Sequence, residues 1–252
     1  MKFFSDRTKF WLFPSVLMFA IWNPFPSSVL ASPARNQGES AANVDAQTIQ
    51  ISSDDAKIPA YLAKPKSGGK HSAVIIVHDT TGLNGGVEAV ARRFAESGFV
   101  ALAPDLSRGA GEKAIAGLPL TQPVFDLQKA FAYLQGDSSV DSSKISAIGF
   151  GWGGWRVFKM AEDNNSLYRA VIFYGATPTD ENLKAIHASV LGNYAQYDFR
   201  VTGNAVWTEK ELGKKFTYYV YPKTDRGFFL NPSSDTNDSA QQAWTRTLDF
   251  LK

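Results

Sequence analysis

The fold of this chain is decided by one stretch, Ala147-Ile148-Gly149-Phe150-Gly151-Trp152-Gly153-Gly154. The apolar run at 145–150 predicts a buried strand, and the apolar spacing over 153–163 predicts a helix. Glycines at 149, 151 and 153 indicate a sharp turn between them. Gly151, at the centre of this turn, has no side chain.

Strands and helices are expected to alternate on both sides of this unit. The predicted strands are 48–51, 58–62, 73–77, 99–103, 145–150, 170–174, 190–195 and 216–221, and the predicted helices are 87–97, 124–134, 153–163, 206–215 and 240–251. Such alternation is typical of an α/β domain, with a mainly parallel twisted sheet and helices on both faces. We expect one domain, residues 47–252, without internal repeats.

In such sheets, ligands bind at the carboxyl ends of the strands. Residues that directly follow the predicted strands are therefore the candidates for a functional site: His78-Asp79-Thr80, Pro104-Asp105, Gly151-Trp152, Asp198 and Arg226.

Several of these segments resemble motifs of the dienelactone hydrolase family. The segment at 77–84, Val-His-Asp-Thr-Thr-Gly-Leu-Asn, is similar to the family's H-E-x-x-G-L-N. The segment at 101–106 resembles A-x-A-P-D-L, with Arg108 soon after, and Tyr221-Pro222 followed by Gly227-Phe228 fits Y-P-x-x-x-H-G-F. The resemblance runs from about Ile49 to the C-terminus, and it implies an α/β-hydrolase fold and hydrolysis of esters or lactones.

The resemblance also implies where a Cys-Asp-His triad would stand. The nucleophile position falls on Gly151, the acid on Asp198 and the histidine on Arg226, while the backbone N–H groups of Thr80 and Trp152 form the oxyanion hole. Glycine has no nucleophile, and an arginine, which is always protonated in proteins, cannot accept a proton near neutral pH. Two of the three reacting groups are therefore lost.

Each replacement has a structural as well as a functional interpretation. A strained turn costs a non-glycine residue roughly 1–3 kcal/mol, so Gly151 also suits the turn itself. Arg226 either forms an ion pair with Asp198 or, together with Arg108, holds an anionic ligand. His78 and Asp79 complete the candidate pocket, and His78 is either a base or a structural histidine.

Three functional hypotheses follow. The first is a catalytically impaired family member, a pseudoenzyme, that binds a small-molecule carbonyl or anionic ligand. The second is an ester or lactone hydrolase in which Asp198, Asp79 or His78 activates water. The third is a scaffold that binds a protein partner through its surface. The aromatic residues near the turn and the Arg226 loop either fill the core or line a pocket: Trp152, Trp155, Phe228 and Phe229.

Composition limits the chemistry further. The chain has no cysteine, which excludes disulfides, thiolate metal ligands and a cysteine nucleophile. Histidines and carboxylates show no metal-ligand spacing, so no metal is expected. The glycines at 149, 151 and 154 lack the companion features of a dinucleotide site, and no cofactor is expected.

The N-terminus has the pattern of an export signal. A basic region at 2–9 precedes an apolar run at 10–22, and Val29-Leu30-Ala31 offers small residues for cleavage. The run is shorter than the ~20 residues that a transmembrane helix needs. We expect a signal peptide over 1–31, a flexible leader over 32–46 and export of the mature chain. The net charge of +2 lies in the signal, so nothing favours nucleic-acid binding.

Overall fold

The computed structural model describes residues 43–54, 56–119, 121–179 and 181–252. The predicted signal peptide and most of the predicted leader lie outside these ranges. The first strand begins at Val44 and pairs with the second from there, so the last residues of the predicted leader belong to the sheet.

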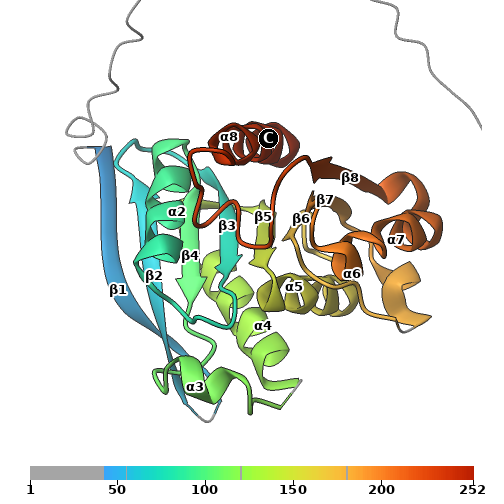
Figure 1. The fold of residues 1–252 in the computed structure, drawn as a ribbon. Coiled ribbons are helices and arrows are strands. Elements are labelled where there is room, and N and C mark those ends of the chain that lie inside the picture. Colours follow the sequence, from blue (N-terminus) through green and yellow to red (C-terminus); the bar gives the residue numbers. More distant parts are fainter. Residues whose placement is uncertain (1–42, 55, 120, 180) are drawn as a thin grey trace, which may run out of the picture. The chain divides into compact units, whose positions relative to one another are not determined.

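The described residues form one eight-stranded sheet in the order β1-β2-β4-β3-β5-β6-β7-β8 (Figure 1). β1 and β2 run antiparallel to their neighbours, and the other strands are parallel, which confirms the predicted α/β fold class. The strands are β1 (Val44–Ser52), β2 (Lys57–Pro65), β3 (His71–Val77), β4 (Val100–Pro104), β5 (Val140–Phe150), β6 (Arg169–Phe173), β7 (Ser189–Ala195) and β8 (Phe216–Tyr221).

All of the expected helices form, close to their predicted ranges, and short ones are added. The longer helices are α2 (Gly85–Glu96), α4 (Thr121–Gln135), α5 (Trp152–Asp163), α7 (Ala205–Leu212) and α8 (Asn237–Leu251). The additional pieces are α3 (Glu112–Ile115), η2 (Glu181–Ala185), α6 (Phe199–Thr202) and η3 (Gly213–Lys215). A single turn is too short to show helical periodicity in the sequence.

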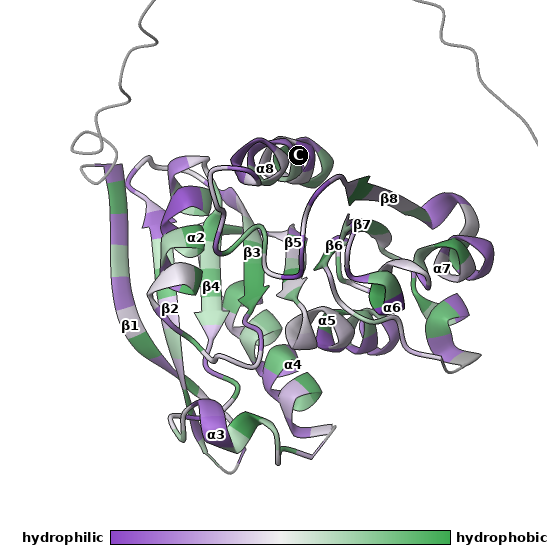
Figure 2. Ribbon diagram, in the orientation of Figure 1, coloured by the Kyte–Doolittle hydropathy of each residue, from purple (hydrophilic) through white to green (hydrophobic). Residues whose placement is uncertain are grey.

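Two apolar layers cover the sheet, one on each face. Successive side chains of a strand point to opposite faces, so Ile75 of β3 packs with α4 and α5, while Ile76 packs with α2 and α8. Figure 2 shows β3 and β4 as hydrophobic along much of their length, whereas β1, at the edge, alternates. The central strands are buried on both faces, as in other parallel sheets.

The parallel strands bring the candidate residues together at their carboxyl ends. Asp79 and Thr80 follow β3, Gly151 joins β5 to α5, and Asp198 lies between β7 and α6. Asn84 caps α2, because its Oδ1 accepts hydrogen bonds from the N–H groups of Gly86 and Val87 at 3.0 and 3.3 Å. This cap fixes where the β3–α2 connection ends.

Candidate functional site

Gly151 forms the strained turn that the sequence predicts between β5 and α5. Its φ and ψ are 49° and −106°, in a region that favours glycine, and its N–H donates to the carbonyl of Phe173 at 2.8 Å. Gly149 and Gly153 are required by close packing, since a Cβ at either would collide with backbone atoms of Gly153 or His78. The backbone geometry therefore holds position 151 at the head of α5.

The space beside Gly151 is filled by two charged side chains. A Cβ added to Gly151 would collide with Nη2 of Arg226 and with Oδ2 of Asp79. Arg226 Nη2 also lies 3.4 Å from Asp79 Oδ1, which makes an ion pair between the two. An aspartate–arginine pair thus borders the position where the resemblance places a nucleophile.

The Asp79 carboxylate occupies the predicted oxyanion hole. Its Oδ1 accepts hydrogen bonds from the N–H of Thr80 at 2.8 Å and from the N–H of Trp152 at 3.0 Å. These are the two N–H groups that the sequence assigned to the hole, and the structure brings them together around one oxygen. Backbone N–H groups at a helix start favour a negative charge, and Asp79 supplies it from within the chain.

Arg226 does not pair with Asp198. Its ion pair is with Asp79, and Asp198 Oδ2 is buried without a hydrogen-bond partner among the described residues. The Arg226 side chain is 48% exposed, so its guanidinium lies at the mouth of the site while the Asp198 oxygen lies below the surface. The expected replacement of an acid–histidine contact by an Asp198–Arg226 ion pair is therefore wrong.

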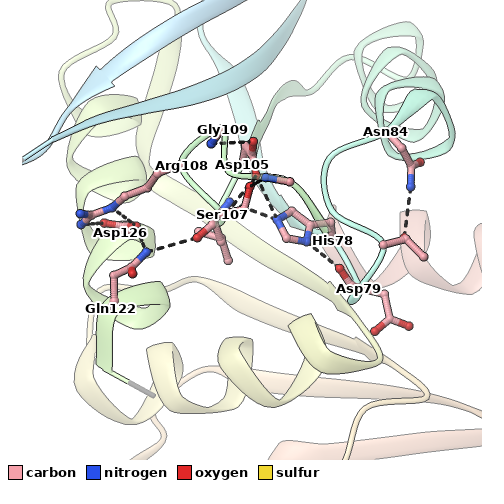
Figure 3. A network of polar contacts seen from close by, with 12 residues as sticks. His78, Asp79, Asn84, Asp105, Ser107, Arg108, Gly109, Gln122 and Asp126 are labelled. Atoms are coloured by element: carbon pink, nitrogen blue, oxygen red, sulfur yellow. Dashed lines mark hydrogen bonds and ion pairs between the residues drawn. The ribbon is translucent and has the colours of Figure 1, made fainter. Parts of the chain in front are cut away.

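His78 is a structural residue in the network shown in Figure 3. The ring is fully buried; Nδ1 lies 2.7 Å from the Asp79 carbonyl, and Nε2 accepts from the Leu106 N–H at 3.1 Å. Nδ1 therefore has the proton and donates it to the carbonyl. Burial lowers the pKa of His78, which keeps the ring neutral. Because both nitrogens are engaged, His78 has no free lone pair for a base.

Arg108 lies away from Arg226. Its guanidinium makes two hydrogen bonds to the buried carboxylate of Asp126, at 2.9 and 2.8 Å (Figure 3). It borders a separate surface pocket with Thr121 and Gln122. The structure therefore does not bring Arg108 and Arg226 to one anion site, because a bidentate pair with Asp126 holds Arg108 beside α4.

A pocket of about 330 Å³ opens beside the turn. Its wall includes Thr80, Gly151, Trp152, Trp155, Arg156 and Arg226. Phe228 and Phe229 are instead buried in the core layer with α2 and α8, so the four aromatic residues divide between pocket and core. Sequence reasoning missed Arg156; its one signal was a basic residue in the second turn of the helix that follows Gly151.

Two further findings concern absences in the described part of the chain. Its histidines and carboxylates form no group of three that would suit a metal ion. None of its helices has the length and apolar character needed to cross a bilayer.

A family model matches most of the sequence. The model described as "Dienelactone hydrolase family" matches residues 58–252. The chain belongs to the dienelactone hydrolase family. The matched range includes every strand from β3 to β8 and all the candidate residues of the site.

The names of similar proteins are consistent with this family. A "Putative carboxymethylenebutenolidase" of Methylorubrum extorquens is 27% identical over 231 residues, which cover 81% of this chain and 79% of the relative. A protein of the same name from Saccharolobus solfataricus is 28% identical over 255 residues, 81% of this chain and 97% of the relative. The crystal structure of a dienelactone hydrolase from Anabaena variabilis has a TM-score of 0.71 and 18% identity, and covers 83% of this chain and all of that one. The last likeness concerns the fold alone.

Proposed function

We propose that this member of the dienelactone hydrolase family does not hydrolyse esters through a covalent intermediate, and that it acts as a binding or accessory protein. The observation that supports this most directly is the position of the Asp79 carboxylate, which accepts from both N–H groups of the oxyanion hole. A substrate oxyanion needs those same donors, so Asp79 competes with the transition state.

The loss of the other reacting groups supports the same proposal. Covalent hydrolysis needs a nucleophile, a group that moves its proton and donors for the oxyanion. Position 151 has no side chain, the guanidinium of Arg226 has no lone pair with which to accept a proton, and His78 uses both ring nitrogens in the fold. What remains is a pocket walled by tryptophans and arginines, which suits binding of a small-molecule carbonyl or anionic ligand.

Restoring the triad tests the proposal. The purified chain should show no turnover of p-nitrophenyl acetate above that of an Asp79→Asn variant. A triple variant, Asp79→Ala with Gly151→Cys and Arg226→His, should release p-nitrophenol, because it vacates the oxyanion hole and restores a nucleophile and a histidine at the family's positions. Asp79→Ala with Gly151→Cys and Arg226→Gln is the matched control. Wild-type turnover that Asp79→Asn abolishes would contradict the proposal.

An alternative is an ester or lactone hydrolase with a non-standard site, which the names of the relatives favour. Of the three groups that would activate water, His78 and Asp79 are already engaged. Asp198 remains, since its Oδ2 is buried and unpartnered. This alternative requires lactone hydrolysis by the wild-type chain that Asp198→Asn removes while the melting temperature is unchanged.

A further inference from the structure

Arg156 is a buried cation in the wall of the pocket. It lies in the first turns of α5 and is 8% exposed. Its guanidinium carbon lies 3.7 Å from the ring centroid of Trp152 and 5.0 Å from that of Trp155. The ring of Trp152 also stacks against the neutral ring of His78, at 5.7 Å between centroids. Stacking on two indoles holds the guanidinium in place.

One hydrogen-bond donor of Arg156 is unused within the described part of the chain. Nη1 donates to the carbonyl of Trp152 at 3.3 Å, while Nε is buried without a partner among the described residues. A guanidinium has five N–H donors, and buried donors in native proteins are nearly always satisfied. An unsatisfied donor that belongs to a pocket residue is the pattern expected of a group whose partner is a ligand.

The charges around the pocket leave one cation without a counterion. Arg226 is paired with Asp79, and no described carboxylate lies within ion-pair distance of Arg156. Burial lowers the pKa of Arg156 to about 10, which still leaves the side chain charged at neutral pH. Of the two arginines in the pocket wall, only Arg156 therefore lacks a carboxylate partner among the described residues, and a ligand with a single negative charge would pair with it.

Apart from Thr80 and Arg226, the rest of the wall presents no polar side chain. Besides the two indoles, Ala176 and Val201 line the pocket. From these observations we propose that the pocket binds an organic monoanion, with its charged group on the guanidinium of Arg156 and its apolar part against Trp152 and Trp155. This inference rests on the proposed binding function and adds to it the charge of the ligand and the residue that recognises it.

Calorimetric titration of the purified chain with benzoate and with benzamide, its uncharged counterpart, tests this. Benzoate should bind at least about tenfold more tightly than benzamide, as expected for a buried charge-assisted hydrogen bond. Arg156→Gln should remove that difference, and Arg156→Met, which keeps an apolar side chain of similar length, should do the same. Arg246→Gln is the matched control, because Arg246 also stacks on aromatic rings but lies outside the pocket wall.

The outcomes separate this inference from the proposed function. Equal affinity for benzoate and benzamide, unchanged benzoate affinity in both Arg156 variants, or no binding of either probe would overturn the assignment of a monoanion. None of those results would be evidence for ester hydrolysis, so the proposed function would stand. Conversely, wild-type ester turnover that depends on Asp79 would overturn the proposed function, whichever probe binds. Thermal denaturation of each variant establishes that the compared proteins are folded.

Discussion

At the scale of single residues, the side chain of Asp79 occupies the oxyanion hole and forms an ion pair with Arg226. It stands where the family resemblance places a glutamate, and its shorter carboxylate accepts from the N–H of the next residue, Thr80, and from that of Trp152. The sequence identified Asp79, Gly151, Arg226 and the two N–H groups. It did not predict their contacts, because the ion pair joins residues 147 positions apart whose side chains meet only through loop geometry.

Replacing Gly151 by alanine should destabilise the chain by more than backbone strain alone. A non-glycine residue at a positive φ costs roughly 1–3 kcal/mol. The new methyl group would also displace Asp79 and Arg226. Gly213→Ala is the control, because its φ is +57° but no atom lies within 4 Å of its Cβ position. Equal losses of unfolding free energy in urea titrations of the two variants would contradict the predicted collision.

His78 should make stability depend on pH. An unfolded histidine has a pKa near 6.5, and burial lowers the pKa of His78 in the fold. Below about pH 6.5, the unfolded chain binds more protons than the folded chain, so the free energy of unfolding falls as the pH is lowered. The contribution of the neutral His78 ring to the free energy of unfolding is present in full above about pH 6.5.

Urea titrations between pH 8 and pH 5 measure this effect. A His78→Gln variant, although less stable overall, should lose less stability over that range than the wild type. An unchanged pH profile in His78→Gln would assign the dependence to other groups.

At the scale of elements, apolar periodicity predicted every strand and the longer helices. Buried strands such as β3 are continuous apolar runs, and α2, α5 and α8 have an apolar stripe that faces the sheet. The short helices α3 and α6 were not predicted, since four residues do not complete a periodic pattern. Their positions are set by packing with distant segments.

The cap of α2 should contribute measurably to stability. Replacing Asn84 by alanine removes an acceptor for two N–H groups, which typically costs about 1 kcal/mol. Asn84→Asp retains an oxygen in the same place and should preserve most of the stability. Chemical denaturation of both variants checks this, and a loss as large in Asn84→Asp as in Asn84→Ala would argue against capping as the cause.

At the scale of the whole molecule, the alternation of strands and helices indicated the fold. The residues that follow the predicted strands indicated that the site lies at the carboxyl ends of the sheet strands. The family follows from the match over residues 58–252. Arg156 was missed, because the burial of its guanidinium and its unpartnered Nε are set by packing that the sequence does not show. Similarly, Arg108 shares a motif with the family, yet its pairing with Asp126 takes it to a different pocket.

We also propose that the whole chain is exported and cleaved after Ala31. The basic start and the apolar run that follows are the basis for this. Expression with the natural N-terminus should give an exported protein whose mass corresponds to a start at Ser32, and Ala31→Phe should slow processing. Recovery of the unprocessed chain from the cytosol alone would contradict the proposal.

The crowding of Gly151 by Asp79 and Arg226 has a consequence for the history of the chain. A mutation that returned a cysteine to position 151 would meet both side chains at once, and it would gain no histidine to activate it. A nucleophile at 151 therefore requires both neighbouring side chains to move or change. On the proposed function, no single one of these substitutions gives an activity for selection to favour, so hydrolysis would be difficult to regain one substitution at a time.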